Sequence, residues 1–228
     1  MKRFIPNALT SLNLLAGAVS VPLFFAGEFR VGASLIILAA VFDFLDGFAA
    51  RLLNARSEIG AQLDSLADVV SFGFAPSIAI YCFMVSRGFE PAWVSNAAFF
   101  IVVFSAIRLA KFNVDTRQTD EFIGLPTPAN ALALVMVPLL MMDSDFIPSN
   151  FELPLFLGII TLSSVLMVSE LRLVALKFKT WAFAENLFRY LLILASPIIL
   201  FVFGMQGFPL IIILYLILSL IKNGISKN

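Results

Sequence analysis

Four aspartates lie in two segments that otherwise have a membrane composition. Asp43 and Asp46 are three residues apart in one apolar segment, and Asp64 and Asp68 are four residues apart in the next. Each pair therefore shares one face of a helix. Because the turn between the segments is short, we expect two antiparallel helices that present two layers of carboxylates to each other.

Such a cluster of carboxylates calls for a cation. Four carboxylates at close range cannot all stay ionised without compensating positive charge, and one charged group at the bilayer centre costs at least about 2.5 kcal/mol. Mg²⁺ or Mn²⁺ suits such oxygen ligands, and two ions can clamp both ends of a phosphoryl displacement. A carboxylate also has the reach to accept a proton from an alcohol.

Small and basic residues accompany the aspartates. The small ones either let the two helices approach closely or leave room for a ligand; they are Gly47, Ala50 and Gly60. Arg51 and Arg56 lie where they can contact phosphate oxygens. In the structural alternative, the aspartates pair with Arg51, Arg56 or Arg108 and only hold the helices together.

The composition indicates a polytopic membrane protein. The 228-residue chain is 61% hydrophobic and 13% charged, with a mean hydropathy of +0.99, which is too apolar for a soluble domain. It has no histidine, so acid and base chemistry falls to carboxylates, and its one cysteine, Cys82, is expected to pack in an apolar run. We expect a lipid bilayer as its surroundings, no nucleic-acid partner and no cleaved signal peptide.

Eight apolar segments are each about long enough to cross a bilayer. We expect an all-α bundle of eight transmembrane helices, near residues 7–27, 31–53, 62–85, 92–112, 127–147, 152–169, 187–204 and 208–222. With a cytoplasmic amino terminus, 13 of the 15 Lys and Arg residues fall on the cytoplasmic side, and only Arg30 and Arg87 fall outside. Both termini are therefore predicted to be cytoplasmic.

The whole chain, residues 1–228, is interpreted as one integral membrane domain. Its catalytic core is expected at about 1–147, with additional helices at about 152–222. Between the sixth and seventh segments, residues 171–185 are typical of either an amphipathic helix on the cytoplasmic surface or a solvated linker.

The aspartate motif resembles that of a known family. Its residues in order are Asp43-x2-Asp46-Gly47-x2-Ala50-Arg51-x8-Gly60-x3-Asp64-x3-Asp68. This string matches without departure the motif of the CDP-alcohol phosphotransferase family. The resemblance implies an integral membrane enzyme that transfers a phosphatidyl group from a CDP-linked lipid to an alcohol and releases CMP.

The same resemblance implies a role for each motif residue. Asp43, Asp46 and Asp64 would hold two divalent cations, Mg²⁺ or Mn²⁺. Asp68 would contact a metal and act as general base on the acceptor hydroxyl. The nucleotide and pyrophosphate site would be lined by Gly47, Ala50, Arg51 and Gly60.

Other segments resemble the phosphatidylserine synthase branch of this family. They are "PNALTSLNLLAG" (6–17), "SLADVVSFGFAPS" (65–77), "IRLAKFNVDTRQTDEFIGLPTPANA" (107–131) and "LMVSELRLVALKFK" (166–179) with the helix pair after it. The resemblance implies CDP-diacylglycerol and L-serine as substrates, with phosphatidylserine and CMP as products. It also implies a homodimer in a bacterial or archaeal cytoplasmic membrane, with the active site facing the cytoplasm.

The serine site calls for a cation and polar groups near Asp68, because serine carries a carboxylate. The candidates for binding the acceptor or the lipid phosphate are Arg56, Arg108, Lys111, Asn113, Thr127 and Asn13. Simpler roles are open to them as well. The basic residues would anchor the helix at the lipid headgroups, and Thr127 would cap the fifth helix.

Three alternative functions stay open at this point. A phosphorylated acceptor, glycerol 3-phosphate or inositol phosphate, would favour a denser basic pocket than the sequence suggests. A cation transporter would use the aspartates as a pathway, but the sequence has no second copy of the pattern. A non-catalytic scaffold would not need the intact motif.

Overall fold

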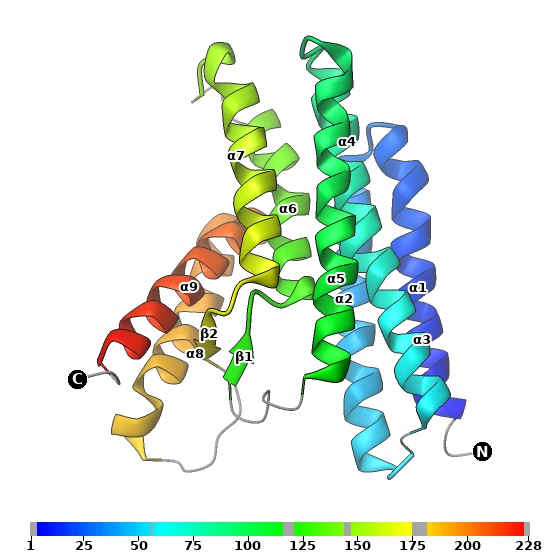
Figure 1. Ribbon diagram of the computed structural model, residues 1–228, viewed down its shortest axis with the longest axis vertical. Coiled ribbons are helices and arrows are strands. Elements are labelled where there is room, and N and C mark those ends of the chain that lie inside the picture. The colour runs from blue at the N-terminus through cyan, green and yellow to red at the C-terminus, as the bar shows by residue number, and fades with distance from the viewer. Residues whose placement is uncertain (1–3, 56, 116–120, 144–146, 175–181, 226–228) are drawn as a thin grey trace.

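The computed structural model describes residues 4–55, 57–115, 121–143, 147–174 and 182–225 (Figure 1). Long helices stand side by side in a bundle, and a slanted pair of helices at the carboxyl end leans against it. The elements in order are α1 (Phe4–Phe25), α2 (Phe29–Leu52), α3 (Glu58–Asp68), η1 (Val69–Phe74), α4 (Ala75–Ser86), η2 (Ala92–Phe99), α5 (Phe100–Val114), β1 (Glu121–Ile123), α6 (Thr127–Met142), α7 (Ser149–Val168), β2 (Arg172–Val174), α8 (Phe183–Phe203), η3 (Gly204–Gly207) and α9 (Phe208–Ile225).

Helices α1, α2 and α3 pack closely because glycines lie at their contacts. A Cβ atom on Gly17 of α1 would come within 2.6 Å of the Ser71 Cα in η1. A Cβ atom on Gly32 of α2 would similarly meet the ring of Phe24 in α1. Small residues at such points let helix backbones approach each other in a membrane. This packing brings the helices with the aspartates against α1.

The third span changes its helical type directly after Asp68. It begins at Ser57, whose hydroxyl accepts a hydrogen bond from the backbone N–H of Gly60 (3.1 Å) and caps α3. After Asp68 the chain forms η1, a π-helix of six residues, before α4 continues the span. Ser71 in η1 donates a hydrogen bond to the carbonyl oxygen of Asn13 in α1 (3.0 Å). Such π-helical turns are rare and are often found at functional sites.

A two-stranded antiparallel sheet departs from the all-α expectation. Strand β1 pairs with β2, and Phe122 lies opposite Leu173. The expected helix or linker at 171–185 is therefore wrong at Arg172–Val174, because these residues pair with a distant strand that the local pattern does not reveal. Residues 175–181 of that segment lie outside the described part. The backbone N–H of Val174 donates to the Ser219 hydroxyl (3.2 Å), which attaches the sheet to α9.

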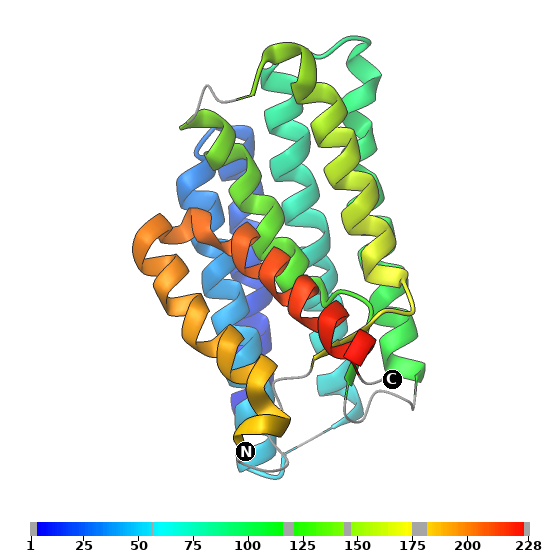
Figure 2. The ribbon, with the colours of Figure 1, turned by 90° about the vertical axis from the view of Figure 1, so that its left-hand side faces the viewer.

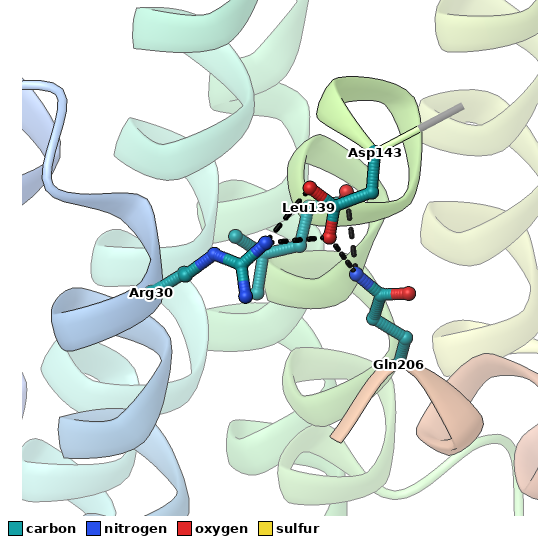
Figure 3. Close-up of polar contacts among 4 residues, drawn as sticks. All are labelled: Arg30, Leu139, Asp143 and Gln206. Carbon is teal, nitrogen blue, oxygen red and sulfur yellow. Dashed lines mark hydrogen bonds and ion pairs between the residues drawn. The ribbon is translucent and has the colours of Figure 1, made fainter. Parts of the chain in front are cut away.

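Helices α8 and α9 form a slanted hairpin that packs against α6 (Figure 2). Their turn, η3, is attached to the bundle through Asp143, the residue after α6 (Figure 3). The Nη2 atom of Arg30 in α2 donates to both carboxylate oxygens of Asp143, at 2.8 and 2.7 Å. The Nε2 atom of Gln206 in η3 donates to the same carboxylate at 2.5 Å. Asp143 therefore joins α2, α6 and the hairpin.

The described helices are those of an integral membrane protein. Six helical stretches are long and apolar enough to cross a membrane: Phe4–Phe25, Phe29–Leu52, Glu58–Ser86, Ala92–Val114, Ser149–Val168 and Asn186–Gly224. Helix α6 is apolar but has only 16 residues, and the 39-residue last stretch contains most of α8 and α9. Each of the eight expected segments thus coincides with a helix, although six stretches meet the length and hydropathy requirements.

Removing the Asp143 carboxylate should weaken the attachment of the α8–α9 hairpin. We expect Asp143→Ala to lower the Tm in detergent by about 2–4 °C, because a partly exposed ion pair contributes at most about 1 kcal/mol. Thermal unfolding of the purified protein measures this. Glu28→Gln is the matched control. Glu28 is an exposed acid directly before α2, the helix that contains Arg30, and the Glu28 side chain has no partner among the described residues. An equal loss in both variants would contradict the assigned role.

Candidate active site

Three carboxylates from two neighbouring helices converge at one point. Asp43 comes from α2, and Asp64 and Asp68 come from α3. Each offers a carboxylate oxygen, and these oxygens all lie within 4.8 Å of one another. Asp68 is buried, and the other two are partly buried. A compact set of oxygen ligands suits a hard divalent cation, so these residues fit the expected metal site.

Asp46 lies outside this group of three. The hydroxyl of Thr10 in α1 donates a hydrogen bond to Asp46 Oδ2 (2.5 Å) and lies 3.0 Å from the carbonyl oxygen of Pro6. Asp46 nevertheless stays beside the group, because it lines the same cavity as Asp64. The two faces that the sequence predicts do meet, but one of the four carboxylates turns toward a third helix.

None of the four aspartates forms an ion pair within the described part of the chain, whose ion pairs are Arg30–Asp143 and Arg87–Glu152. Arg51 is exposed near the end of α2, and Arg56 lies outside the described residues. Arg108 in α5 is buried and forms no hydrogen bond or ion pair with any of the four aspartates within the described residues. The described residues therefore do not support the structural alternative, in which arginines pair directly with the aspartates.

Asp68 has one neutral neighbour from α1. The side-chain amide of Asn13 donates to Asp68 Oδ1 at 3.4 Å, and the Asn13 backbone accepts the hydrogen bond from Ser71. Asn13 is fully buried, and its own Oδ1 has no partner among the described residues. Asn13 thus contacts Asp68 from α1, and the π-helix η1 begins at the residue after Asp68. The sequence suggested Asn13 only as a weak candidate for the acceptor.

A cavity of about 230 Å³ adjoins the carboxylates, between α1, α2 and α3. It is lined by Pro6, Asn7, Thr10, Asp46, Gly47, Ala50, Ala55, Ser57, Gly60, Ala61 and Asp64. A Cβ atom on Gly47 would meet no atom within 4 Å, so this glycine presents bare backbone to open space. A Cβ atom on Gly60 would lie 3.0 Å from the Ser57 hydroxyl and 3.1 Å from Asn7 Oδ1. The predicted Gly47, Ala50 and Gly60 thus share one cavity, whereas Arg51 does not line it.

Sequence reasoning missed the polar residues that α1 contributes to this cavity. Asn7 and Thr10 lie three residues apart, and Asn13 follows after three more. This spacing puts all three on one face of α1. The polar face of this otherwise apolar helix was therefore a signal in the sequence from which α1 could have been assigned to the site.

A second cavity, of about 280 Å³, lies between the carboxyl-terminal ends of α5 and α7. It is lined by Arg108, Lys111, Val114, Asp115, Ile123, Met167, Val168, Ser169 and Glu170. Arg108 is 6% exposed, its Nε has no hydrogen-bond partner in the described part, and its guanidinium lies over the Phe112 ring at 4.7 Å. A buried cation with an unused donor suits an anionic ligand.

Of the remaining acceptor candidates in the described residues, only Lys111 also lines this cavity. Lys111 lines the second cavity, and its Nζ lies 3.5 Å from the Val168 carbonyl oxygen. Asn113 does not line it; its amide donates to the Ser65 hydroxyl at 2.8 Å on an exposed surface. Thr127 is fully buried, its hydroxyl has no partner among the described residues, and it lines neither cavity.

Known proteins resemble this chain in sequence over most of its length. The profile of the CDP-alcohol phosphatidyltransferase family matches residues 3–169, which include both cavities except Glu170. A CDP-diacylglycerol–serine O-phosphatidyltransferase of Helicobacter pylori (strain J99) is 38% identical over 219 residues, 95% of this chain and 90% of that protein. An archaetidylserine synthase of Methanothermobacter thermautotrophicus is 35% identical over 171 residues, 73% of this chain and 68% of that protein.

A protein of Mycobacterium tuberculosis (strain H37Rv) is also similar. It is named a CDP-diacylglycerol–serine O-phosphatidyltransferase and is 34% identical over 175 residues, 73% of this chain and 59% of its own length. The profile match extends over most of the chain, and its range includes the positions of the four aspartates. The chain therefore belongs to the CDP-alcohol phosphatidyltransferase family.

Proposed function

We propose that this chain transfers the phosphatidyl group of CDP-diacylglycerol to L-serine, which gives phosphatidylserine and CMP. The observation that carries the proposal is the group of Asp43, Asp64 and Asp68 beside a glycine-lined cavity. Serine as the acceptor is supported by the names of the relatives, which include serine phosphatidyltransferases from bacteria and an archaetidylserine synthase.

Two divalent cations, Mg²⁺ or Mn²⁺, would be held by the carboxylates. Asp43, Asp64 and Asp68 would supply the shared oxygens, and Asp46 would complete the set from its place beside them. When bound, such ions offset the negative charge of the pyrophosphate and of the departing CMP. They also offset the charge of the buried carboxylates, which makes the cluster tolerable in an apolar bundle.

Asp68 is proposed as the general base. Its carboxylate accepts the proton of the serine hydroxyl while the serine oxygen forms a bond to the phosphatidyl phosphorus. The bond between that phosphorus and CMP breaks, and CMP leaves with the electron pair. Asn13 keeps one oxygen of Asp68 hydrogen-bonded, so the carboxylate presents its other oxygen to the acceptor.

The two cavities suit the two substrates. The cytidine diphosphate would occupy the cavity lined by Gly47, Ala50 and Gly60, and Arg51 would contact its phosphate oxygens. Arg56, which lies outside the described residues, stays a predicted phosphate contact. The serine carboxylate would pair with Arg108, helped by Lys111, in the second cavity. Helix α5, which contains Arg108, packs against η1 directly after Asp68, so serine bound there would have its hydroxyl near the base.

The membrane arrangement is proposed from the charge pattern. The chain would cross the membrane eight times as one domain, with a catalytic core of about 1–147 and additional helices at about 152–222. Helix α7 would serve the core as well, since Met167 and Val168 line the second cavity. Both termini and the active site would face the cytoplasm of a bacterium or archaeon, and the protein would be a homodimer.

Release of CMP by the purified protein in detergent tests the function. We expect release from CDP-diacylglycerol with Mg²⁺ or Mn²⁺ when L-serine is present, and no release after the metal is removed with a chelator. Glycerol 3-phosphate, inositol phosphate and a reaction without acceptor are the comparisons. CMP release with another acceptor would support phosphatidyl transfer but would rule out serine as the acceptor. If the folded protein releases no CMP with any acceptor, the proposed enzymatic activity is contradicted.

The general base should be sensitive to loss of its charge. We expect Asp68→Asn to lower kcat by at least about 10²-fold, because the amide cannot accept the serine proton. Retention of radiolabelled CDP-diacylglycerol by the variant should persist. Asp143→Asn makes the same chemical change far from the cluster and should keep its kcat. Near-normal turnover by purified Asp68→Asn would refute the assigned base.

Filling the first cavity should affect the nucleotide lipid alone. We expect Gly47→Leu to raise the KM for CDP-diacylglycerol about tenfold, because the new side chain occupies open space that the ligand needs. The KM for serine should be unchanged. The Tm should not fall, since a Cβ here meets no atom within 4 Å and leucine favours the helix. Gly47→Ala is the control with little added bulk. Equal KM values for CDP-diacylglycerol in both variants would show that the nucleotide lipid does not bind in this cavity.

A further inference from the structure

An apolar groove of about 290 Å³ follows the seam between α5 and α7. Its floor includes Ile160, which is 2% exposed, and Ser164, which is 3% exposed. Its rim includes Phe100, Thr161 and Val165, which are exposed. The groove therefore opens sideways, toward the lipid that surrounds a membrane-spanning bundle.

This groove continues the second cavity along the same two helices. Phe104 lines the groove, and Arg108, one turn further along α5, lines the cavity. On α7, Ser164 lines the groove and Val168, again one turn further, lines the cavity. The seam thus has an apolar part followed directly by a part with a buried cation. A molecule with an anionic group and an apolar chain matches this order.

We propose that one acyl chain of CDP-diacylglycerol lies in the α5–α7 groove. This rests on the proposed function, since it places the substrate of that reaction. The reacting phosphate would lie beside Arg108, whose guanidinium would contact both this phosphate and the serine carboxylate, and the glycerol would lead from there past Phe104 into the groove. The rise of about 1.5 Å per residue from Ala97 to Phe104 gives a groove on the order of 10 Å long, which holds part of a long chain.

Ser164 adds a polar contact at the end nearest the cavity. Its hydroxyl is buried and has no hydrogen-bond partner among the described residues. The ester carbonyl of an acyl chain is an acceptor, and it lies at the glycerol end of the chain. The Ser164 hydroxyl would donate to this carbonyl, which satisfies a group that otherwise stays unpaired.

The test blocks the rim of the groove with a larger side chain and compares substrates with long and short acyl chains. Thr161→Trp places a large ring at the groove, and Leu162→Trp places the same ring on the neighbouring residue of α7, which is 61% exposed and does not line the groove. We expect Thr161→Trp to raise the KM for CDP-dioleoylglycerol about tenfold, the loss of roughly two buried methylene groups. The KM for CDP-dibutyrylglycerol and for serine should be unchanged, and Leu162→Trp should match the original chain throughout.

A binding measurement separates this inference from the function. Radiolabelled CDP-dioleoylglycerol is retained on immobilised protein without serine, with excess phosphatidylcholine as competitor. If the unsubstituted protein releases no CMP, the function fails, and weaker retention by Thr161→Trp than by Leu162→Trp still supports the groove. Equal retention by both variants, equal loss toward long and short chains, or displacement by phosphatidylcholine would each overturn it.

Discussion

Carboxylates that share a small volume inside an apolar bundle are the constraint on which this structure depends. Their mutual repulsion and their desolvation both oppose folding unless positive charge or hydrogen-bond donors come close. Asp46 has Thr10, and Asp68 has Asn13, but neither donor carries charge. The close packing of α1 against α2 and η1 brings these donors within reach. A cation would supply what the described residues leave out.

The two cavities of the proposed site differ in character. The cavity among α1, α2 and α3 is lined by small residues and backbone, which suits a ligand that must approach closely. The cavity between α5 and α7 contains the buried guanidinium of Arg108. In the proposed reaction the CMP moiety and the serine would therefore occupy different cavities, which suits a displacement whose attacking and leaving groups lie on opposite sides of phosphorus.

Polar contacts at several points along the bundle attach α7 and the helices after it to the core. Met167 Sδ accepts hydrogen bonds from Ser105 in α5 (3.5 Å) and from Asn130 in α6 (3.3 Å), which fixes the end of α7 at the second cavity. The pairing of β1 with β2 holds the chain that leaves α7, and Ser219 attaches that sheet to α9. Gly124 has a positive φ of 75° and lies against the Met167 backbone, where a side chain would not fit. The acceptor end of the site thus depends on the additional helices.

The sequence by itself determined the membrane class, the helical segments and the facing aspartates, because hydropathy and three- and four-residue spacings are local properties of a helix. It did not reveal that Asp46 accepts a hydrogen bond from Thr10, that the Nε atom of buried Arg108 has no partner in the described part, or that Asn113 bonds Ser65. It also missed the π-helix after Asp68 and the β1–β2 pair. These features depend on contacts between residues far apart in the chain, so only the packing of the helices decided them.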